Sequence, residues 1–224
     1  MPRAASIALC AALALLELAH PTWPDGAVAQ AVNAAGGTWL PLHAALIVAY
    51  GLLTWRLWVS VRQPPPILAR LALALFAMAN TAFLAVDGVV VGLGAAREPV
   101  GVDQLWASLP VTLLADLTGA TWCLALLSLD AARVAGGLDR PFVGLLALTW
   151  LAFIAGATAL PGPALLARGL AIAAAVWLVY HRGTRGLANG LLTFGAVLRQ
   201  HVGPEAALGL LCVAAALALP DRRR

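Results

Sequence analysis

Two histidines and an aspartate lie within apolar stretches of the chain, where an ionisable side chain is costly and needs a structural or chemical reason. His20 lies at the end of the first stretch, His43 lies near the beginning of the second, and Asp87 lies in the third. Imidazole nitrogens and carboxylate oxygens are ligands for zinc, manganese and non-haem iron, and two imidazoles can also ligate haem iron. We therefore predict a metal site of His20, His43 and Asp87. The same residues, together with Trp39, are the predicted cofactor-binding residues for a haem or a divalent metal ion.

The sequence spacing gives this set little further support, because no HxxxH or HExxH pattern occurs in the chain. Glu17 and Asp25 are expected at the same end of the molecule, so two or three carboxylates accompany the imidazoles. An alternative is that both histidines are interfacial residues hydrogen-bonded to loop carbonyl groups, with Asp87 paired to one of them. Both interpretations remain open at this point.

Asn80 and Asp116 extend the set of polar groups in apolar stretches. Asn80 precedes Asp87 by seven residues, which is two helical turns, so both side chains share one helix face. Asp116 lies near the middle of the fourth apolar stretch, with no arginine close to it in sequence. We predict a proton or polar relay of Asn80, Asp87 and Asp116. The alternative is a seam of neutral, hydrogen-bonded side chains.

A small-residue pattern accompanies Asp87. Gly88 and Gly92 form a GxxxG pattern, which lets another helix approach closely. We therefore expect the segment 80–88 to face protein rather than lipid.

The composition indicates which solvent surrounds these residues. Of 224 residues, 62% are hydrophobic and 11% are charged, with a mean hydropathy of +0.90, whereas soluble domains are about 45–50% apolar and about 25% charged. A core of this size cannot hide so much apolar sequence from water. The composition excludes a soluble enzyme, a disordered tail and a disulfide scaffold, and the scattered arginines give no sign of a nucleic-acid partner. The lipid bilayer is the expected surrounding.

The apolar stretches predict an all-α fold, because helices satisfy the backbone within lipid and the period-two alternation of a membrane barrel is absent. A spanning helix needs about 20 residues at 1.5 Å per residue. We predict one transmembrane domain over 1–224, a polytopic bundle with a C-terminal hairpin over 186–219 that is re-entrant or made of two short helices. Six spans are expected, at about 4–20, 40–60, 67–95, 106–134, 142–160 and 163–181.

The first 29 residues resemble a secretory signal, with Arg3 before an apolar run and Ala27-Val28-Ala29 before Gln30. We interpret this segment as a retained first span, because about a dozen residues with two prolines separate the apolar run from the Ala-x-Ala. Arginines concentrate in alternate connections, which predicts cytoplasmic N- and C-termini. The use of arginine without lysine is typical of a GC-rich bacterial genome, so we expect the bacterial cytoplasmic (inner) membrane.

The order His20-Pro21, Trp39, His43 and Asp87-Gly88 resembles a loose group of uncharacterised small bacterial polytopic inner-membrane proteins. Those proteins begin with one span that ends in His-Pro, followed by an outer loop and a Trp-x-x-x-His entry to the second span. The resemblance covers roughly the first 95 residues. It implies a polytopic helical bundle and no particular activity.

Together these observations favour a non-catalytic subunit of a membrane complex, or a cofactor- or small-ligand-binding module, with its polar cluster in the outer leaflet. Short connections and small-residue helix faces suit packing against other membrane subunits or against further copies of the chain. One alternative is a small proton-coupled transporter that uses Asp87 and Asp116. Another is an outward-facing metal-dependent membrane enzyme built on His20, His43 and Asp87.

Overall fold

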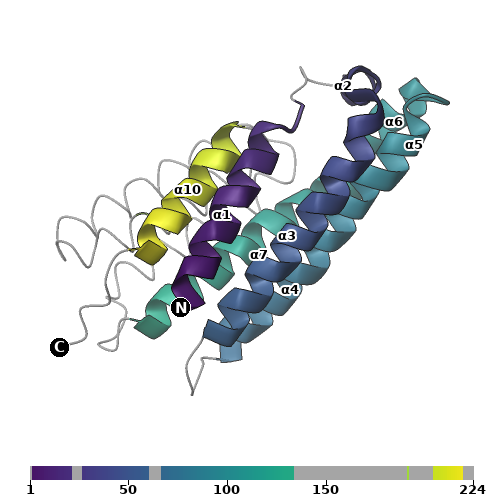
Figure 1. Cartoon of the computed structure of the whole chain (residues 1–224). Coiled ribbons are helices and arrows are strands. Elements are labelled where there is room, and N and C mark those ends of the chain that lie inside the picture. The colour runs from purple at the N-terminus through teal and green to yellow at the C-terminus, as the bar shows by residue number, and fades with distance from the viewer. Residues whose placement is uncertain (1, 22–26, 61–66, 134–190, 192–203, 219–224) are drawn as a thin grey trace.

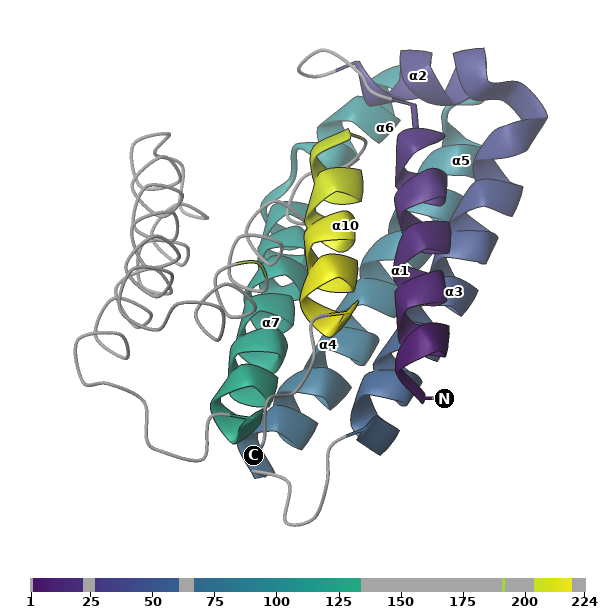
Figure 2. The ribbon, with the colours of Figure 1, turned by 60° about the vertical axis from the view of Figure 1, so that its left-hand side comes forward.

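Long helices bring distant parts of the chain side by side. The computed structural model describes residues 2–21, 27–60, 67–133, 191 and 204–218, and within these ranges the chain is helical with no strand, which confirms the expected all-α fold. The long helices run alongside one another (Figure 1 and Figure 2). They are α1 (Pro2–Leu18), α3 (Trp39–Ser60), α4 (Ile67–Ala85), α7 (Leu109–Arg133) and α10 (Pro204–Ala218). Helix α4 packs against α3 and α7, and α1 packs against α3 and α10.

The first three expected spans correspond to α1, α3 and the helical run that begins with α4. The fourth expected span, about 106–134, corresponds to α7, which begins at Leu109 after a separate helix, α6 (Pro99–Trp106). Pro110 has no backbone N–H to bond the carbonyl group of Trp106, which favours a break in the helix at this point.

The remaining expectations on span number fall largely outside the described residues. This is so for the fifth and sixth expected spans, 142–160 and 163–181, and for most of the expected hairpin over 186–219. Helix α10 is the main described part of that hairpin. Among the described residues, two helical runs are long and apolar enough to cross a membrane, Val28–Val59 and Arg70–Gly94.

A helical cap covers one end of the long helices. The connection expected as a loop over 21–39 contains α2 (Val28–Ala35) and the 3-10 turn η1 (Gly36–Thr38), and η1 leads directly into α3. An Asp103 carboxylate oxygen of α6 accepts a hydrogen bond from the Ala29 backbone N–H at 2.9 Å. This bond satisfies one of the free N–H groups at the start of α2. Helices α2 and α6 therefore lie together across the end of the bundle (Figure 2).

Buried apolar side chains form two separate clusters. The larger cluster lies among the five long helices, and its largest fully buried members include Leu13, Tyr50, Phe76, Trp122 and Leu210. The smaller cluster lies under the cap and consists of Val28, Ala29, Val32, Trp39, Val91, Ala95 and Val102.

The third apolar stretch changes its helical form at Asp87. Helix α4 continues into the π-helix η2 (Val86–Val91) and then into the short helix α5 (Gly92–Gly94). In a π-helix each N–H bonds the carbonyl group five residues earlier, and such turns are frequent at functional sites. Asn80 and Asp87 are buried, whereas Thr81 is exposed. The expectation that segment 80–88 faces protein is therefore right for one face of the helix and wrong for the other.

The glycines of this stretch meet α3. A Cβ atom on Gly88 would lie 2.5 Å from the Cβ atom of His43, and one on Gly92 would lie 2.8 Å from Cδ1 of Trp39. Both distances are too short for real contacts, so only glycine permits this approach. The close helix contact expected from the GxxxG pattern is confirmed, and its partner is the first part of α3.

Candidate metal centre

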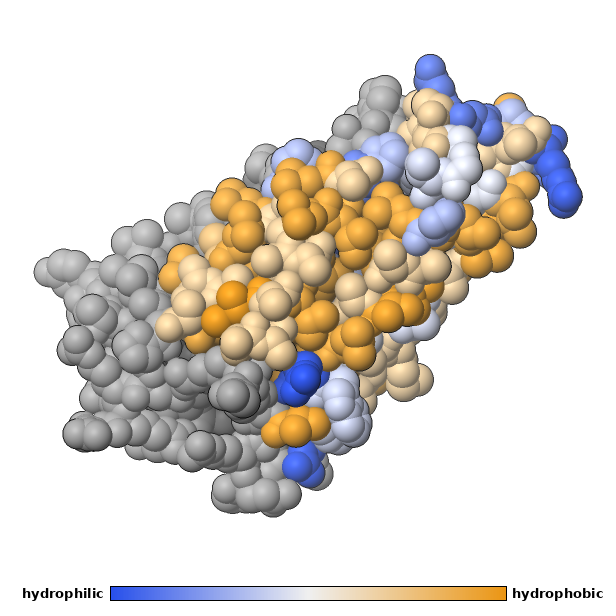
Figure 3. Space-filling view, in the orientation of Figure 1, coloured by the Kyte–Doolittle hydropathy of each residue, from blue (hydrophilic) through white to orange (hydrophobic). Residues whose placement is uncertain are grey.

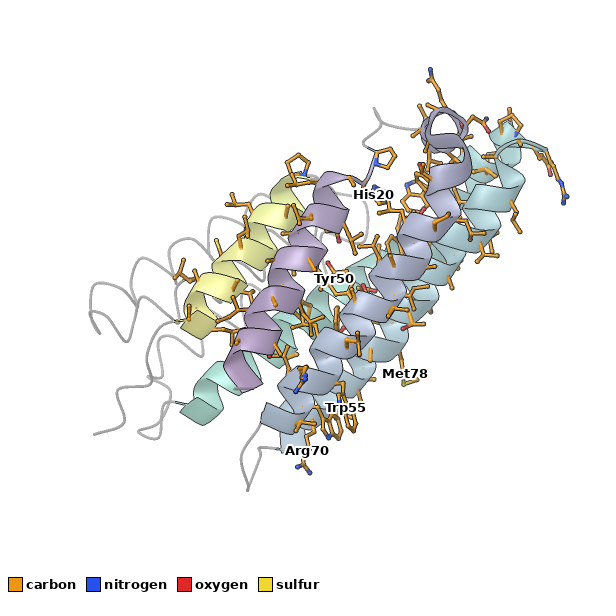
Figure 4. All side chains as sticks on the ribbon, viewed as in Figure 1. His20, Tyr50, Trp55, Arg70 and Met78 are labelled. Carbon is orange, nitrogen blue, oxygen red and sulfur yellow. The ribbon has the colours of Figure 1, made fainter. Side chains whose placement is uncertain are left out.

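Three polar side chains meet near the capped end, one from the residues that follow α1, one from α3 and one from η2. His20 follows α1, and its backbone N–H donates to the carbonyl group of Glu17 at 3.2 Å in a final tight turn. His43 lies one turn into α3, and Asp87 lies in η2. His20 is 4% exposed, and the other two residues are 1% exposed. Figure 4 shows His20 at the end of α1, on the side of α3.

The potential ligand atoms of these residues lie close together. His43 Nε2 is 3.0 Å from Asp87 Oδ2 and 3.3 Å from His20 Nε2. His20 Nε2 lies 3.9 Å from Asp87 Oδ2. The structure thus brings together the three residues that the sequence analysis selected as metal ligands, which we name the triad.

Backbone carbonyl groups fix the orientation of both imidazoles. His20 Nδ1 lies 2.9 Å from the carbonyl oxygen of Pro21, and His43 Nδ1 lies 2.8 Å from that of Trp39. A carbonyl oxygen can only accept, so each Nδ1 carries the proton and donates it. In the neutral imidazole the Nε2 atom then bears a lone pair, and both Nε2 atoms point into the triad.

Trp39 packs against the triad from the side of the cap. Its ring centroid lies 4.6 Å from that of His43 and 5.3 Å from that of His20. Its indole N–H donates to the backbone carbonyl oxygen of Asp87 at 3.0 Å. The predicted cofactor-binding residue Trp39 therefore contacts all three members of the triad and joins them to the smaller apolar cluster.

The triad presents three electron-pair donors to one another in a buried site. Such a set is stable only with a positive charge between its members, either a proton or a metal ion. Three ligands at about 2.0–2.2 Å from a tetrahedral ion are about 3.3–3.6 Å apart, close to the observed separations of 3.0, 3.3 and 3.9 Å. The donor set therefore fits a divalent metal ion. The alternative drawn from the sequence, in which both histidines bond loop carbonyl groups and Asp87 pairs with one of them, is matched in part. His20 bonds the carbonyl group of Pro21 and Asp87 pairs with His43, but the carbonyl group that His43 bonds belongs to Trp39, the first residue of α3.

A second polar pair lies beside the triad. Tyr50 of α3 donates its hydroxyl proton to Glu17 Oε1 at 2.7 Å. Glu17 is 3% exposed, although it carries a carboxylate in an apolar helix. Figure 4 shows Tyr50 between α1 and α3, farther from the cap than His20.

The Glu17–Tyr50 pair is missing from the set of site residues predicted from the sequence. A signal was present, because Glu17 and His20 stand in a Glu-x-x-His spacing that places both side chains on one helix face. Tyr50 lies seven residues after His43, which is two turns along the same face of α3. Glu17 precedes its histidine in the chain, whereas Tyr50 follows its own. Because α1 and α3 are antiparallel, both residues lie on the side of the triad toward the middle of the bundle.

The predicted relay of Asn80, Asp87 and Asp116 is only partly described. Asn80 is 2% exposed and lies on the same helical run as Asp87. Asp116 belongs to α7, but its side chain lies outside the described residues. The relay therefore stays a prediction.

Known proteins offer no independent assignment for this site. Comparison of the chain with protein-family models, with curated proteins and with solved structures finds no match.

Proposed function

We propose that this chain is an integral membrane protein whose triad binds one divalent metal ion, and that it serves as a non-catalytic metal-binding module of a membrane assembly. The observation that carries the proposal is the convergence of two imidazole nitrogens and one carboxylate oxygen in a buried site. Both imidazoles also donate a hydrogen bond from Nδ1, the nitrogen that faces away from the triad, to a backbone carbonyl group. Metal-bound histidines are oriented by this kind of bond.

The exposed surface supports the membrane part of the proposal. Large apolar side chains are exposed along the long helices, among them Leu15, Val48, Leu52, Trp55 and Met78. In Figure 3 apolar residues cover the middle of the visible face, and hydrophilic residues gather toward two ends. Soluble monomers rarely expose continuous apolar surface on this scale. The proposal includes the bacterial cytoplasmic membrane, with the triad toward the outer leaflet and both termini cytoplasmic.

The end of the bundle away from the cap, where α3 ends and α4 begins, has the composition of a membrane interface. Trp55 is 63% exposed there, and the guanidinium carbon of Arg70 lies 5.5 Å from the ring centroid of Trp58 (Figure 4). Tryptophan and arginine are typical of the interface between hydrocarbon and headgroups. The triad and this aromatic end are therefore expected to lie near opposite faces of the bilayer.

The geometry supports a bare metal ion over a haem. A haem held by two axial histidines needs them on opposite faces of the macrocycle. Here the two imidazole centroids are 5.0 Å apart and nearly perpendicular, and Asp87 Oδ2 lies 3.0 Å from His43 Nε2, where the macrocycle would have to pass. Buried nitrogen and oxygen ligands suit zinc, manganese, cobalt or ferrous iron.

Metal content of the purified chain tests the proposal. The full chain is isolated in mild detergent, stripped with a chelator, reloaded with Co²⁺ or Zn²⁺ and measured by elemental analysis. We expect one ion per chain in the wild type and loss of most of that ion in Asp87→Asn. The matched control is Asp103→Asn, the same chemical change in the cap, which should retain the ion. A wild type without stoichiometric metal, or an Asp87→Asn variant that retains it, contradicts the proposal.

The membrane assignment is tested separately. Native membranes washed with alkaline carbonate should retain the chain in the pellet after ultracentrifugation, because its apolar surface is solvated by lipid. Recovery of the chain in the supernatant without detergent contradicts this part of the proposal.

A further inference from the structure

Two buried carboxylate oxygens near the triad receive no hydrogen bond within the part of the chain that the structure describes. They are Asp87 Oδ1 and Glu17 Oε2. The second oxygen of each group is engaged, since Asp87 Oδ2 faces His43 Nε2 at 3.0 Å and Glu17 Oε1 accepts the Tyr50 hydroxyl at 2.7 Å. A buried acceptor without a donor is costly, so each oxygen indicates a donor other than the described residues.

Glu17 lies beside the triad without being one of its ligands. It precedes His20 by one helical turn and is close enough to interact electrostatically with both imidazoles. It does not belong to the group whose ligand atoms all lie within 4.8 Å of one another. This placement excludes direct coordination of the same ion together with the triad, so a contact between Glu17 and the ion needs an intervening water molecule.

The triad supplies three ligands, and the described residues offer no fourth, which leaves one position of a tetrahedral ion open. The Trp39 ring covers both imidazoles, with centroid distances of 4.6 and 5.3 Å, so the side toward the cap is occupied. Glu17 lies away from the cap, one helical turn before His20, where it accepts the Tyr50 hydroxyl.

We propose that Glu17 is a positioning residue for a water molecule at the open position of the metal, an inference that rests on the proposed metal site. This water donates one proton to a hydrogen bond with Glu17 Oε2 and the other to a hydrogen bond with Asp87 Oδ1. A single water has two hydrogens, so it satisfies both unpartnered oxygens. Tyr50 holds Glu17 in place, and a divalent ion balances the charges of the two carboxylates.

Competition between water and a small anion tests this inference. Co²⁺ affinity is measured by the visible spectrum of the ion in the full chain, and azide is then titrated to replace the bound water. In Glu17→Gln we expect Co²⁺ affinity to fall about 10- to 100-fold, because partners of this kind contribute that much to metal binding. Azide affinity should rise at least about tenfold, because the negative charge beside the open position has been removed. The matched control is Glu98→Gln, an exposed glutamate in the cap, which should change neither affinity.

The two affinities must change in opposite directions, because a variant that only loosens the site would lower both. A joint decrease, or no change in either affinity, overturns the role of Glu17 and leaves the metal site intact. Failure of the wild type to bind Co²⁺ overturns the metal site and this inference together. Tyr50→Phe is a second test, and it decides the question if Glu17→Gln does not fold. In this variant we expect the Co²⁺ affinity to fall several-fold, with the azide affinity unchanged or raised. Wild-type values for both affinities contradict the inference.

Discussion

The apolar middle of the bundle and the triad end are built from the same long helices, yet their backbones differ. Around Phe76 and Trp122, α4 and α7 are regular α-helices, and the two rings pack at a centroid distance of 4.7 Å. At the triad, α1 ends in a tight turn, η1 precedes α3, and α4 gives way to the π-helix η2. Apolar packing tolerates many side-chain arrangements, whereas three polar atoms at 3.0 to 3.9 Å need the backbone to be adjusted. Stability and metal binding should therefore respond to different substitutions.

The largest effect on stability is expected from Phe76→Ala in the apolar middle. Phe76 is fully buried between Tyr50 and Trp122, so its removal leaves a cavity and should lower the free energy of unfolding by about 3–5 kcal/mol. Denaturation in detergent measures this change, and the folded fraction should keep wild-type metal affinity. Met78→Ala, at a site 71% exposed, is the control with little expected loss. Weaker metal binding by folded Phe76→Ala contradicts the separation of the two regions.

Gly88→Ala should affect both properties, because the added Cβ atom would lie 2.5 Å from the Cβ atom of His43. The backbone fixes that partner atom, so α3 and η2 must move apart, at a cost of about 1–3 kcal/mol. Metal affinity should fall steeply, since His43 and Asp87 separate. Gly51→Ala is the matched control, because nothing lies within 4 Å of its added Cβ atom. Equal metal binding by the two variants contradicts the importance of the close approach.

Trp39→Phe removes the indole N–H that bonds the Asp87 carbonyl group and preserves most of the ring packing. We expect a loss of about 1 kcal/mol in stability and about a tenfold loss in Co²⁺ affinity, the lower end of the range for residues that orient ligands. Calorimetry and cobalt titration measure the two effects. If metal affinity is unchanged, Trp39 serves the cap and not the triad.

The smallest effect is expected in the cap. Asp103→Asn keeps an oxygen acceptor for the Ala29 N–H and loses the negative charge at the start of α2. A charge at a helix N-terminus contributes about 0.3–1 kcal/mol, so amide hydrogen exchange within α2 should become several-fold faster. Exchange in α3 and the metal content should be unchanged. A large loss of metal would show that the cap determines the geometry of the triad.

The sequence predicts the ligands of the site better than its surroundings. His20, His43 and Asp87 are conspicuous because ionisable residues are rare in apolar stretches, and each lies near an end of its stretch or in its second half. The role of Gly88 could also be predicted from the sequence, since a GxxxG pattern beside a polar residue indicates a close contact between two helices.

Other features depend on contacts that a linear pattern does not contain. The π-helix η2 leaves no sign in the hydrophobic pattern, because one extra residue in a turn changes the apolar content little. Helix α2 is eight residues long and is stabilised by Asp103 of a different helix, so its own sequence predicts only a loop. The Glu17–Tyr50 bond joins residues 33 positions apart and becomes evident once α1 and α3 are seen to be antiparallel neighbours.

The π-helix also bears on how related chains can be recognised. Each residue of an α-helix turns the chain by about 100°, so the single additional residue within Val86–Val91 shifts the register of everything that follows it. An alignment that keeps strict helical periodicity through this segment would pair Gly92 with an unrelated position. Related chains should therefore be recognised by two regular helical segments whose apolar patterns differ in register by one residue. The two histidines that face this point should accompany them.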